Sequence, residues 1–274
     1  MDRVRRALDR ARIERTERAE PLRVEPVRDA EVVQAIEPGL PRVILYTCTK
    51  TFTPAHSVLE SNRVLPTDSV TPAAAAIRML RTQVLQRMDA RGWRSIAVFS
   101  PGMHDGKTTT AINLAISMAT DHSHTVLLVD LDLKHPSVAQ RLDVNPESGI
   151  DDVLTSNARV EDSLYHPEGF DRLVIMPARQ ALPNSSEVLA GPRSRELIAE
   201  LRARYPERII VFDLPPVLNA DDALAFAPFV DCGLMVVAEG TTRRQDLARA
   251  MQLLRDTPIV GTVLNRASHA PRGY

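Results

Sequence analysis

Apolar and polar positions alternate between two kinds of pattern from residue 94 onward. Short runs of β-branched and other apolar residues are followed by longer stretches in which apolar residues recur every three or four positions. The first pattern predicts buried strands and the second predicts amphipathic helices. Strands that alternate with helices pair mostly in parallel, so we predict an α/β protein with a mostly parallel sheet flanked by helices. The predicted strands cover residues 95–99, 125–129, 173–176, 209–212, 234–237 and 259–264, and the predicted helices cover residues 72–90, 107–119, 194–204 and 243–254, with a shorter one at 149–154.

The first seventy residues have a different character. Residues 1–20 place opposite charges at i,i+4 spacing, which predicts a solvated, charged helix, although its thin apolar stripe leaves open a helix that docks on a partner. Seven prolines between residues 21 and 72 predict a linker, with one short strand at residues 43–46. We therefore expect a charged helix and linker at residues 1–71, a main domain at residues 72–267 and a short tail at residues 268–274.

Composition narrows the setting of the protein. The 34 basic and 35 acidic residues leave a net charge of -1, so the chain as a whole does not attract nucleic acid or an anionic membrane. The two cysteines, Cys48 and Cys232, are far apart and predict neither a disulfide framework nor a zinc site. No apolar run approaches the ~18 residues of a membrane span. We expect a soluble protein of the reducing cytoplasm, which would need a partner to reach the membrane.

The segment that joins the predicted strand 95–99 to the helix at 107 carries the most chemistry. Its sequence matches a phosphate-binding loop except that Pro101 stands where the general pattern has its first glycine. In such a loop backbone N–H groups bind phosphate at the positive end of a helix, the lysine neutralises phosphate oxygens and the following hydroxyl binds Mg²⁺. His104, in this loop, could instead be a solvated residue without a catalytic role. The predicted contacts with ATP are Gly102, Met103, His104, Asp105, Gly106, Lys107, Thr108 and Thr109.

Acidic residues directly follow two of the other predicted strands. Asp130 and Asp132 follow the strand at 125–129, and Asp213 follows the strand at 209–212. The carboxyl ends of parallel strands meet at one edge of a sheet, where ligands bind in open α/β folds. Each acid could instead cap a helix or begin a turn. Beside a phosphate loop, we predict that they serve a Mg²⁺ site together with Thr108.

These motifs resemble the bacterial tyrosine kinases of exopolysaccharide and capsule biosynthesis, which are relatives of the deviant Walker P-loop ATPases. The resemblance spans about residues 72–267 and rests on four blocks, at residues 100–110, 126–136, 213–223 and 263–265. It implies a P-loop NTPase fold, a Rossmann-like three-layer sandwich. It also implies catalytic roles for Lys107, Asp130 and Asp132, metal ligands at Thr108, Asp130 and Asp213, and an adenine contact at Asn265.

The chain departs from this family at several positions. Gly102 stands where related partitioning and division-site ATPases have a signature lysine, which favours the kinase branch. Ala75 replaces the glutamate of the family's Glu-x-x-Arg-x-x-Arg oligomerisation motif, so a homo-oligomer is less strongly implied. The tail of the family is rich in tyrosine, whereas here it offers Tyr274 alone.

The sequence therefore predicts an ATP/Mg²⁺-dependent protein-tyrosine autokinase that regulates polysaccharide biosynthesis and export, with Tyr274 as its autophosphorylation site. The resemblance implies a membrane-embedded partner of the chain-length-determinant, or co-polymerase, class, which would recruit the kinase to the inner face of the membrane. The alternative is a regulatory ATPase, or nucleotide switch, of the same system without protein kinase activity.

Overall fold

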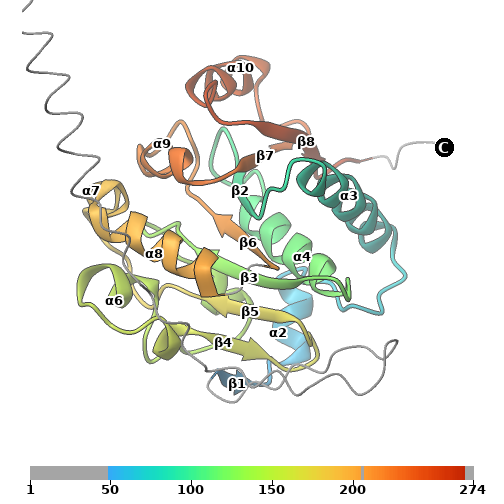
Figure 1. The fold of residues 1–274 in the computed structure, drawn as a ribbon. Coiled ribbons are helices and arrows are strands. Elements are labelled where there is room, and N and C mark those ends of the chain that lie inside the picture. The colour runs from blue at the N-terminus through green and yellow to red at the C-terminus, as the bar shows by residue number, and fades with distance from the viewer. Residues whose placement is uncertain (1–48, 205–206, 269–274) are drawn as a thin grey trace, which may run out of the picture.

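The computed structural model describes residues 49–204 and 207–268, which form one eight-stranded sheet with helices on both faces. The strand order is β1-β4-β5-β3-β6-β2-β7-β8, from the lower to the upper edge in Figure 1. Every pairing is parallel except that of β4 with β5. The strands are β1 (Lys50–Phe52), β2 (Ser95–Phe99), β3 (Thr125–Asp130), β4 (Tyr165–Pro167), β5 (Leu173–Met176), β6 (Arg208–Asp213), β7 (Cys232–Ala238) and β8 (Ile259–Asn265).

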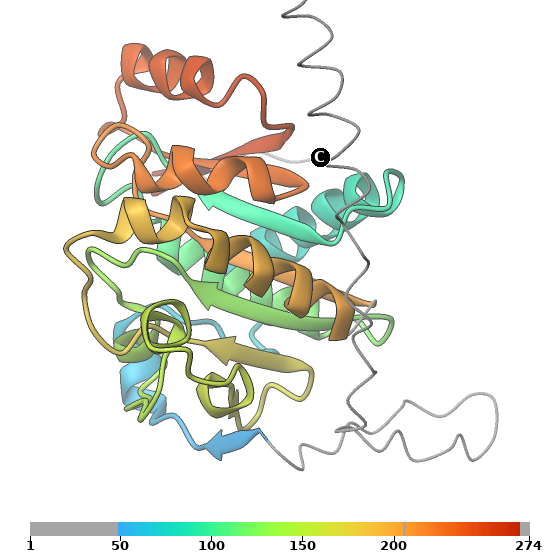
Figure 2. The ribbon, with the colours of Figure 1, turned by 60° about the vertical axis from the view of Figure 1, so that its left-hand side comes forward.

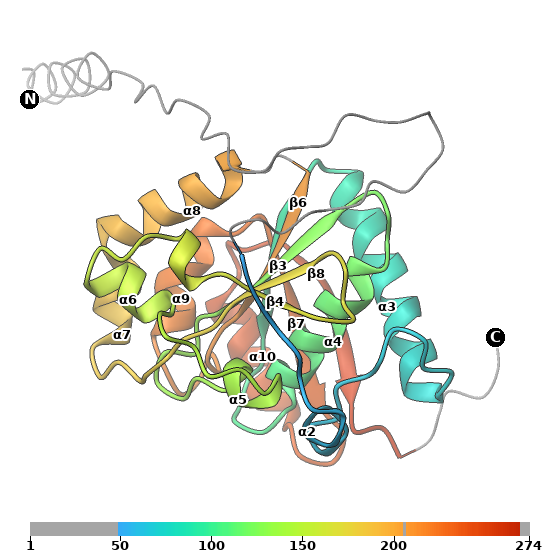
Figure 3. The ribbon, with the colours of Figure 1, turned by 90° about the horizontal axis from the view of Figure 1, so that it is seen from below.

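The helices form two layers, one on each face of the sheet (Figure 2). One layer contains α2 (His56–Ser61), α3 (Pro72–Asp89), α4 (Lys107–Ala119) and α5 (Val138–Arg141). The other contains α6 (Ile150–Thr155), α7 (Ser185–Ala190), α8 (Pro192–Arg204), α9 (Asp222–Phe226) and α10 (Arg244–Leu253). Seen from below, α6 to α9 lie on one side of the strands and α3 and α4 on the other (Figure 3). Two short 3₁₀ helices, Glu161–Ser163 and Ala227–Phe229, complete the described part.

The predicted α/β architecture is confirmed, and the alternation of side chains along the buried strands explains it. Ile96 and Val98 of β2 pack in the core beneath α4, whereas Ala97 and Phe99 pack in the core beneath α7 to α10. The inner strands β2, β3, β5, β6 and β7 are buried on both faces, which requires continuous apolar runs rather than polar alternation. These are the runs from which the strands were predicted.

The Pro-rich segment adds two elements that were not predicted. β1 pairs with β4 in parallel, and α2 packs into the core through Leu59. α3 then begins at Pro72, where the Thr71 hydroxyl accepts a hydrogen bond from the Ala74 N–H at 3.2 Å. The predicted charged helix at 1–20 and the predicted strand at 43–46 lie outside the described residues. Among residues 49–204 and 207–268, no helix combines the length and the apolar character that a membrane span requires.

Candidate nucleotide site

The loop between β2 and α4 has the backbone geometry of a phosphate-binding loop. It leaves the end of β2 after Phe99 and enters α4 at Lys107. Gly106, the N-cap residue of α4, has a φ of 90°, which glycine adopts without the steric cost of a side chain. A Cβ atom at this position would lie 1.9 Å from Asn265 Nδ2. The backbone conformation therefore favours glycine here, and any larger residue would also have to displace the Asn265 side chain.

The side chain of Asp105 ties this loop to the end of β7. Asp105 is 2% exposed, and its Oδ2 accepts a hydrogen bond from the Gly102 N–H at 3.0 Å. Its Oδ1 accepts one from the Thr242 hydroxyl at 2.7 Å, and that hydroxyl accepts one from the Ala238 N–H at 2.8 Å. The carboxylate thus bonds both to its own loop and to the segment after β7. We call Asp105 and Thr242 the loop brace.

Asn265, at the end of β8, holds the same loop from a second strand. Its Nδ2 donates to the Asp105 carbonyl oxygen at 2.9 Å, and its Oδ1 accepts from the Arg266 N–H at 2.9 Å. Both ends of the amide are therefore engaged in protein contacts. The adenine contact that the resemblance implies for Asn265 stays a prediction.

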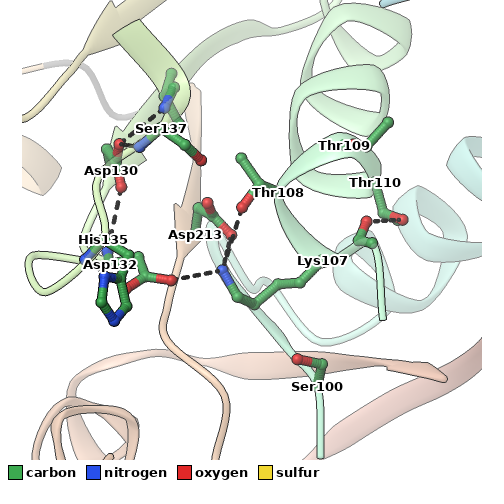
Figure 4. Close-up of polar contacts among 12 residues, drawn as sticks. Ser100, Lys107, Thr108, Thr109, Thr110, Asp130, Asp132, His135, Ser137 and Asp213 are labelled. Carbon is green, nitrogen blue, oxygen red and sulfur yellow. Dashed lines mark hydrogen bonds and ion pairs between the residues drawn. The ribbon is translucent and has the colours of Figure 1, made fainter. Parts of the chain in front are cut away.

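The three predicted acids and the lysine lie together at the carboxyl edge of the sheet (Figure 4). Asp130 of β3 pairs in register with Asp213 of β6, and β6 lies between β3 and β2. Lys107 Nζ donates to Asp213 Oδ1 at 2.7 Å and lies 3.4 Å from Asp132 Oδ2. It also lies 3.3 Å from Thr108 Oγ1. The structure thus brings together residues that are up to 106 positions apart.

Asp130 also organises the backbone that follows it. Its Oδ2 accepts hydrogen bonds from the Ser137 and Val138 N–H groups, each at 3.0 Å, and its Oδ1 accepts one from the Asp132 N–H at 3.2 Å. The capping role that the sequence left open is therefore present at the start of α5. Three of the four acceptor positions of this carboxylate are occupied by backbone donors.

The electrostatics of the site reflect one buried cation among three buried carboxylates. Burial and the neighbouring Asp213 raise the pKa of Asp130 to about 7. Burial also raises the pKa of Asp132, against the opposing effect of Lys107. For Lys107, burial lowers the pKa but the charges of Asp213 and Asp132 outweigh it, so the net pKa is raised. The lysine therefore stays charged and the carboxylates lack a full complement of positive charge.

The donor set fits a Mg²⁺ ion that is held mainly by phosphate oxygens. Asp213 is fully buried, and its Oδ2 has no hydrogen-bond partner in the described part of the chain. The Thr108 hydroxyl lies at the same edge, in the first turn of α4. No group of three or more His, Cys, Asp or Glu side chains among residues 49–204 and 207–268 forms a metal cage. Mg²⁺ commonly uses one or two carboxylates together with substrate phosphates and waters, which this arrangement allows.

The remaining predicted residues occupy different surroundings. Met103 and His104 are exposed on the loop, and His104 has a φ of 65°. The Gly102 N–H is already donated to Asp105. The Thr109 hydroxyl accepts a hydrogen bond from Arg141 at 3.1 Å. Tyr274 lies outside the described residues.

Sequence reasoning missed the side-chain role of Asp105, any role of Thr242 and the contact of Arg141 with the first turn of α4. It also missed an ion pair in which Lys134 Nζ lies 2.9 Å from the buried Asp222 Oδ2 and links the segment after β3 to α9. Of these contacts, only that of Asp105 left a signal in the sequence, because an acidic residue stands directly before the loop glycine Gly106. The other contacts depend on which strands are neighbours.

A strand, a glycine-bearing loop and a helix that begins with Lys-Thr, next to two in-register strand-end aspartates, define a P-loop nucleotide-binding protein. Comparison with known proteins gives the same class, because the family described as AAA domain matches residues 94–230. The kinase domain of Escherichia coli tyrosine kinase ETK superposes with a TM-score of 0.64 at 27% identity, covering 74% of this chain and 80% of that one.

Proteins similar in sequence identify the branch of P-loop proteins to which this chain belongs. Tyrosine-protein kinase YwqD of Bacillus subtilis is 26% identical over 80% of this chain and 92% of its own length. Tyrosine-protein kinase CpsD of Streptococcus pneumoniae is 30% identical over 66% of this chain and 78% of its own length. The succinoglycan biosynthesis transport protein ExoP of Rhizobium meliloti is 31% identical over 63% of this chain, which spans 22% of that longer protein. The chain belongs to the bacterial tyrosine-protein kinase family.

Proposed function

We propose that this protein binds ATP with Mg²⁺ and transfers the γ-phosphoryl group to a tyrosine hydroxyl, with Tyr274 as its own acceptor. The observation that carries the proposal is the contact of Lys107, directly after the phosphate loop, with Asp213 and Asp132. A lysine, a loop of backbone donors and acids for a metal are the parts that phosphoryl transfer uses. Family membership supports the kinase reading over other P-loop reactions.

Each residue has a place in this reaction. Lys107 stabilises the negative charge of the transferred group, and Thr108 and Asp213 would hold Mg²⁺, which would supply further positive charge when bound. Asp130 would complete the metal site through its remaining acceptor position. The tyrosine oxygen forms a bond to the γ-phosphorus while the bond to the β–γ bridging oxygen breaks. Asp132 takes the hydroxyl proton, because its side chain is 10% exposed and less engaged by backbone donors than Asp130.

The biological setting is proposed on the same grounds. One relative is a succinoglycan biosynthesis transport protein, so we place this kinase in exopolysaccharide or capsule biosynthesis and export. A membrane-embedded co-polymerase would be its partner and would recruit it from the cytoplasm to the inner face of the membrane. The motif departure at Ala75, an exposed residue of α3, bears on whether copies of this chain assemble with one another.

Incubation of the purified chain with ATP and Mg²⁺, with and without the cytoplasmic segment of a co-polymerase, tests the proposal. We expect phosphotyrosine at Tyr274 by mass spectrometry, and its loss in Asp213→Asn and in Tyr274→Phe. The Tyr274→Phe variant should still bind ATP, because the tail does not form the phosphate loop.

The second candidate is a regulatory ATPase without protein kinase activity. The single tyrosine of the tail favours it, because one acceptor gives little scope for the multiple phosphorylation that a tyrosine-rich tail permits. Release of inorganic phosphate with no phosphotyrosine on any residue would overturn the kinase proposal and establish this alternative. Absence of ATP binding would overturn both.

A further inference from the structure

The four-residue helix α5 connects the acids of the site to the first turn of α4. At its start, Asp130 Oδ2 accepts the N–H groups of Ser137 and Val138. At its last residue, Arg141 Nη1 donates to the Thr109 hydroxyl at 3.1 Å, and Arg141 Nε donates to the Ser137 hydroxyl at 3.4 Å. The guanidinium of Arg141 is thus held against the first turn of α4.

This first turn is where the charge of a nucleotide would lie. Thr109 is the third residue of α4, whose N-terminal N–H groups and dipole favour a phosphate group. A cation held by the Thr109 hydroxyl is therefore only one side-chain contact away from a phosphate group bound at this helix start. Arginine offers five N–H donors in a planar fork that suits phosphate oxygens, and only two of these donors are used by the hydroxyl groups named above.

The charges of the site leave Arg141 available to bind an anionic ligand. Lys107 is the only cation in contact with Asp132 and Asp213 in the described part of the chain, and it is largely neutralised by them. Arg141, by contrast, is half-buried and forms no ion pair with a carboxylate among residues 49–204 and 207–268. A half-buried cation without a counter-ion is unfavourable in the empty site and becomes favourable when an anion binds beside it.

We propose that Arg141 is a second phosphate-binding cation of this site, which donates to the phosphate chain of a nucleoside di- or triphosphate at Thr109. The inference rests on the proposed ATP binding. It gives a phosphate-binding role to a residue of α5, which belongs neither to the phosphate loop nor to the acids that follow the strands. Because the contact is charge-assisted, its loss should weaken nucleotide binding about 10- to 100-fold.

Calorimetric titration of the full chain with ADP and with ATP, each with Mg²⁺, tests the inference in four variants. Arg141→Met removes the donors and the charge, Arg141→Gln keeps a donor for the Thr109 hydroxyl without the charge, and Arg141→Lys keeps the charge. The matched control is Arg159→Met, which removes the same charge from an exposed arginine that pairs with Asp162. Urea unfolding without nucleotide checks that each variant is folded.

We expect both neutral variants to bind ATP and ADP about 10- to 100-fold more weakly than Arg159→Met, and Arg141→Lys to recover part of the loss. We also expect the ATP dissociation constant of both neutral variants to depend less steeply on NaCl concentration, because one charge contact is missing. Affinities equal to the control would overturn the inference while the proposed function stands. A loss in Arg141→Met that Arg141→Gln restores would also overturn it, since that would show a positioning role through the hydrogen bond alone. Failure of the unaltered chain to bind ATP would overturn the proposed function and the inference with it.

Discussion

Removal of the Thr242 hydroxyl should loosen the phosphate loop and destabilise the fold measurably. Thr242→Val keeps the shape of the side chain but deletes the donor to Asp105 Oδ1 and the acceptor for the Ala238 N–H. A hydrogen bond to a carboxylate contributes about 1.5–3 kcal/mol, and a buried N–H left without a partner costs about 1–3 kcal/mol. The two effects share one atom, so we expect a loss of about 2–4 kcal/mol in the free energy of unfolding.

The neighbouring residue provides the control for this change. Thr241→Val makes the same substitution at an exposed position whose side chain has no hydrogen bond to any residue in 49–204 or 207–268. Urea unfolding can be followed by the fluorescence of Trp93, the single tryptophan of the chain, which lies just before β2. ATP affinity should fall in Thr242→Val alone, because the loop must then be ordered at the moment of binding. A difference of less than about 0.5 kcal/mol between the two variants would refute the loop brace.

Three further changes test other contacts of the site. Gly106→Ala should lower the free energy of unfolding by about 1–2 kcal/mol and weaken ATP binding in titration, because φ is 90° and the new Cβ would contact Asn265; adding Asn265→Ala should relieve the contact but not the backbone strain. Asp130 has a pKa of about 7 in the folded chain and a lower one when unfolded, so the folded state holds the proton more tightly. Stability in urea unfolding without nucleotide should therefore fall as the pH rises from about 4 to about 7, and a slope unchanged in Asp130→Asn would count against this assignment. Lys134→Met should cost about 2–3 kcal/mol by thermal or urea unfolding, because it leaves the buried Asp222 carboxylate without its cation; an unchanged midpoint would refute the role of this pair.

The strands at the centre of the sheet were predictable because each is buried on both faces. Such a strand needs apolar residues at consecutive positions, and the runs at 126–129 and 209–212 supply them. The phosphate loop was predictable for a related reason, since its chemistry depends on local backbone and on adjacent residues. A strand, a loop glycine and Lys-Thr at a helix start can all be recognised within one short segment.

Edge elements and long-range contacts were not predictable in the same way. β1 has three residues with a mostly exposed pattern, so its sequence gives no apolar run, and the prolines around it indicate a linker. The contact between Asp105 and Thr242 spans 137 positions and exists because β7 lies beside β2 in the sheet. No pattern of residue types in the amino-acid sequence reveals that β7 and β2 are neighbours. The same holds for Arg141, whose side chain reaches Thr109 in the first turn of α4 only because α5 packs on the same face of the sheet as α4.

The contacts of Lys107 bear on how its substitution should be interpreted. Lys107→Met is the natural choice for an inactive variant, yet it would leave three buried carboxylates without the cation that contacts two of them. Breaking a buried ion pair by removing one partner costs about 3–5 kcal/mol, which is a large part of the stability of an ordinary domain. Loss of phosphotyrosine in Lys107→Met could therefore reflect unfolding. Asp213→Asn avoids this ambiguity, because it removes one of the excess negative charges and leaves the lysine paired with Asp132, so an inactive but stably folded Asp213→Asn variant isolates the chemistry from the fold.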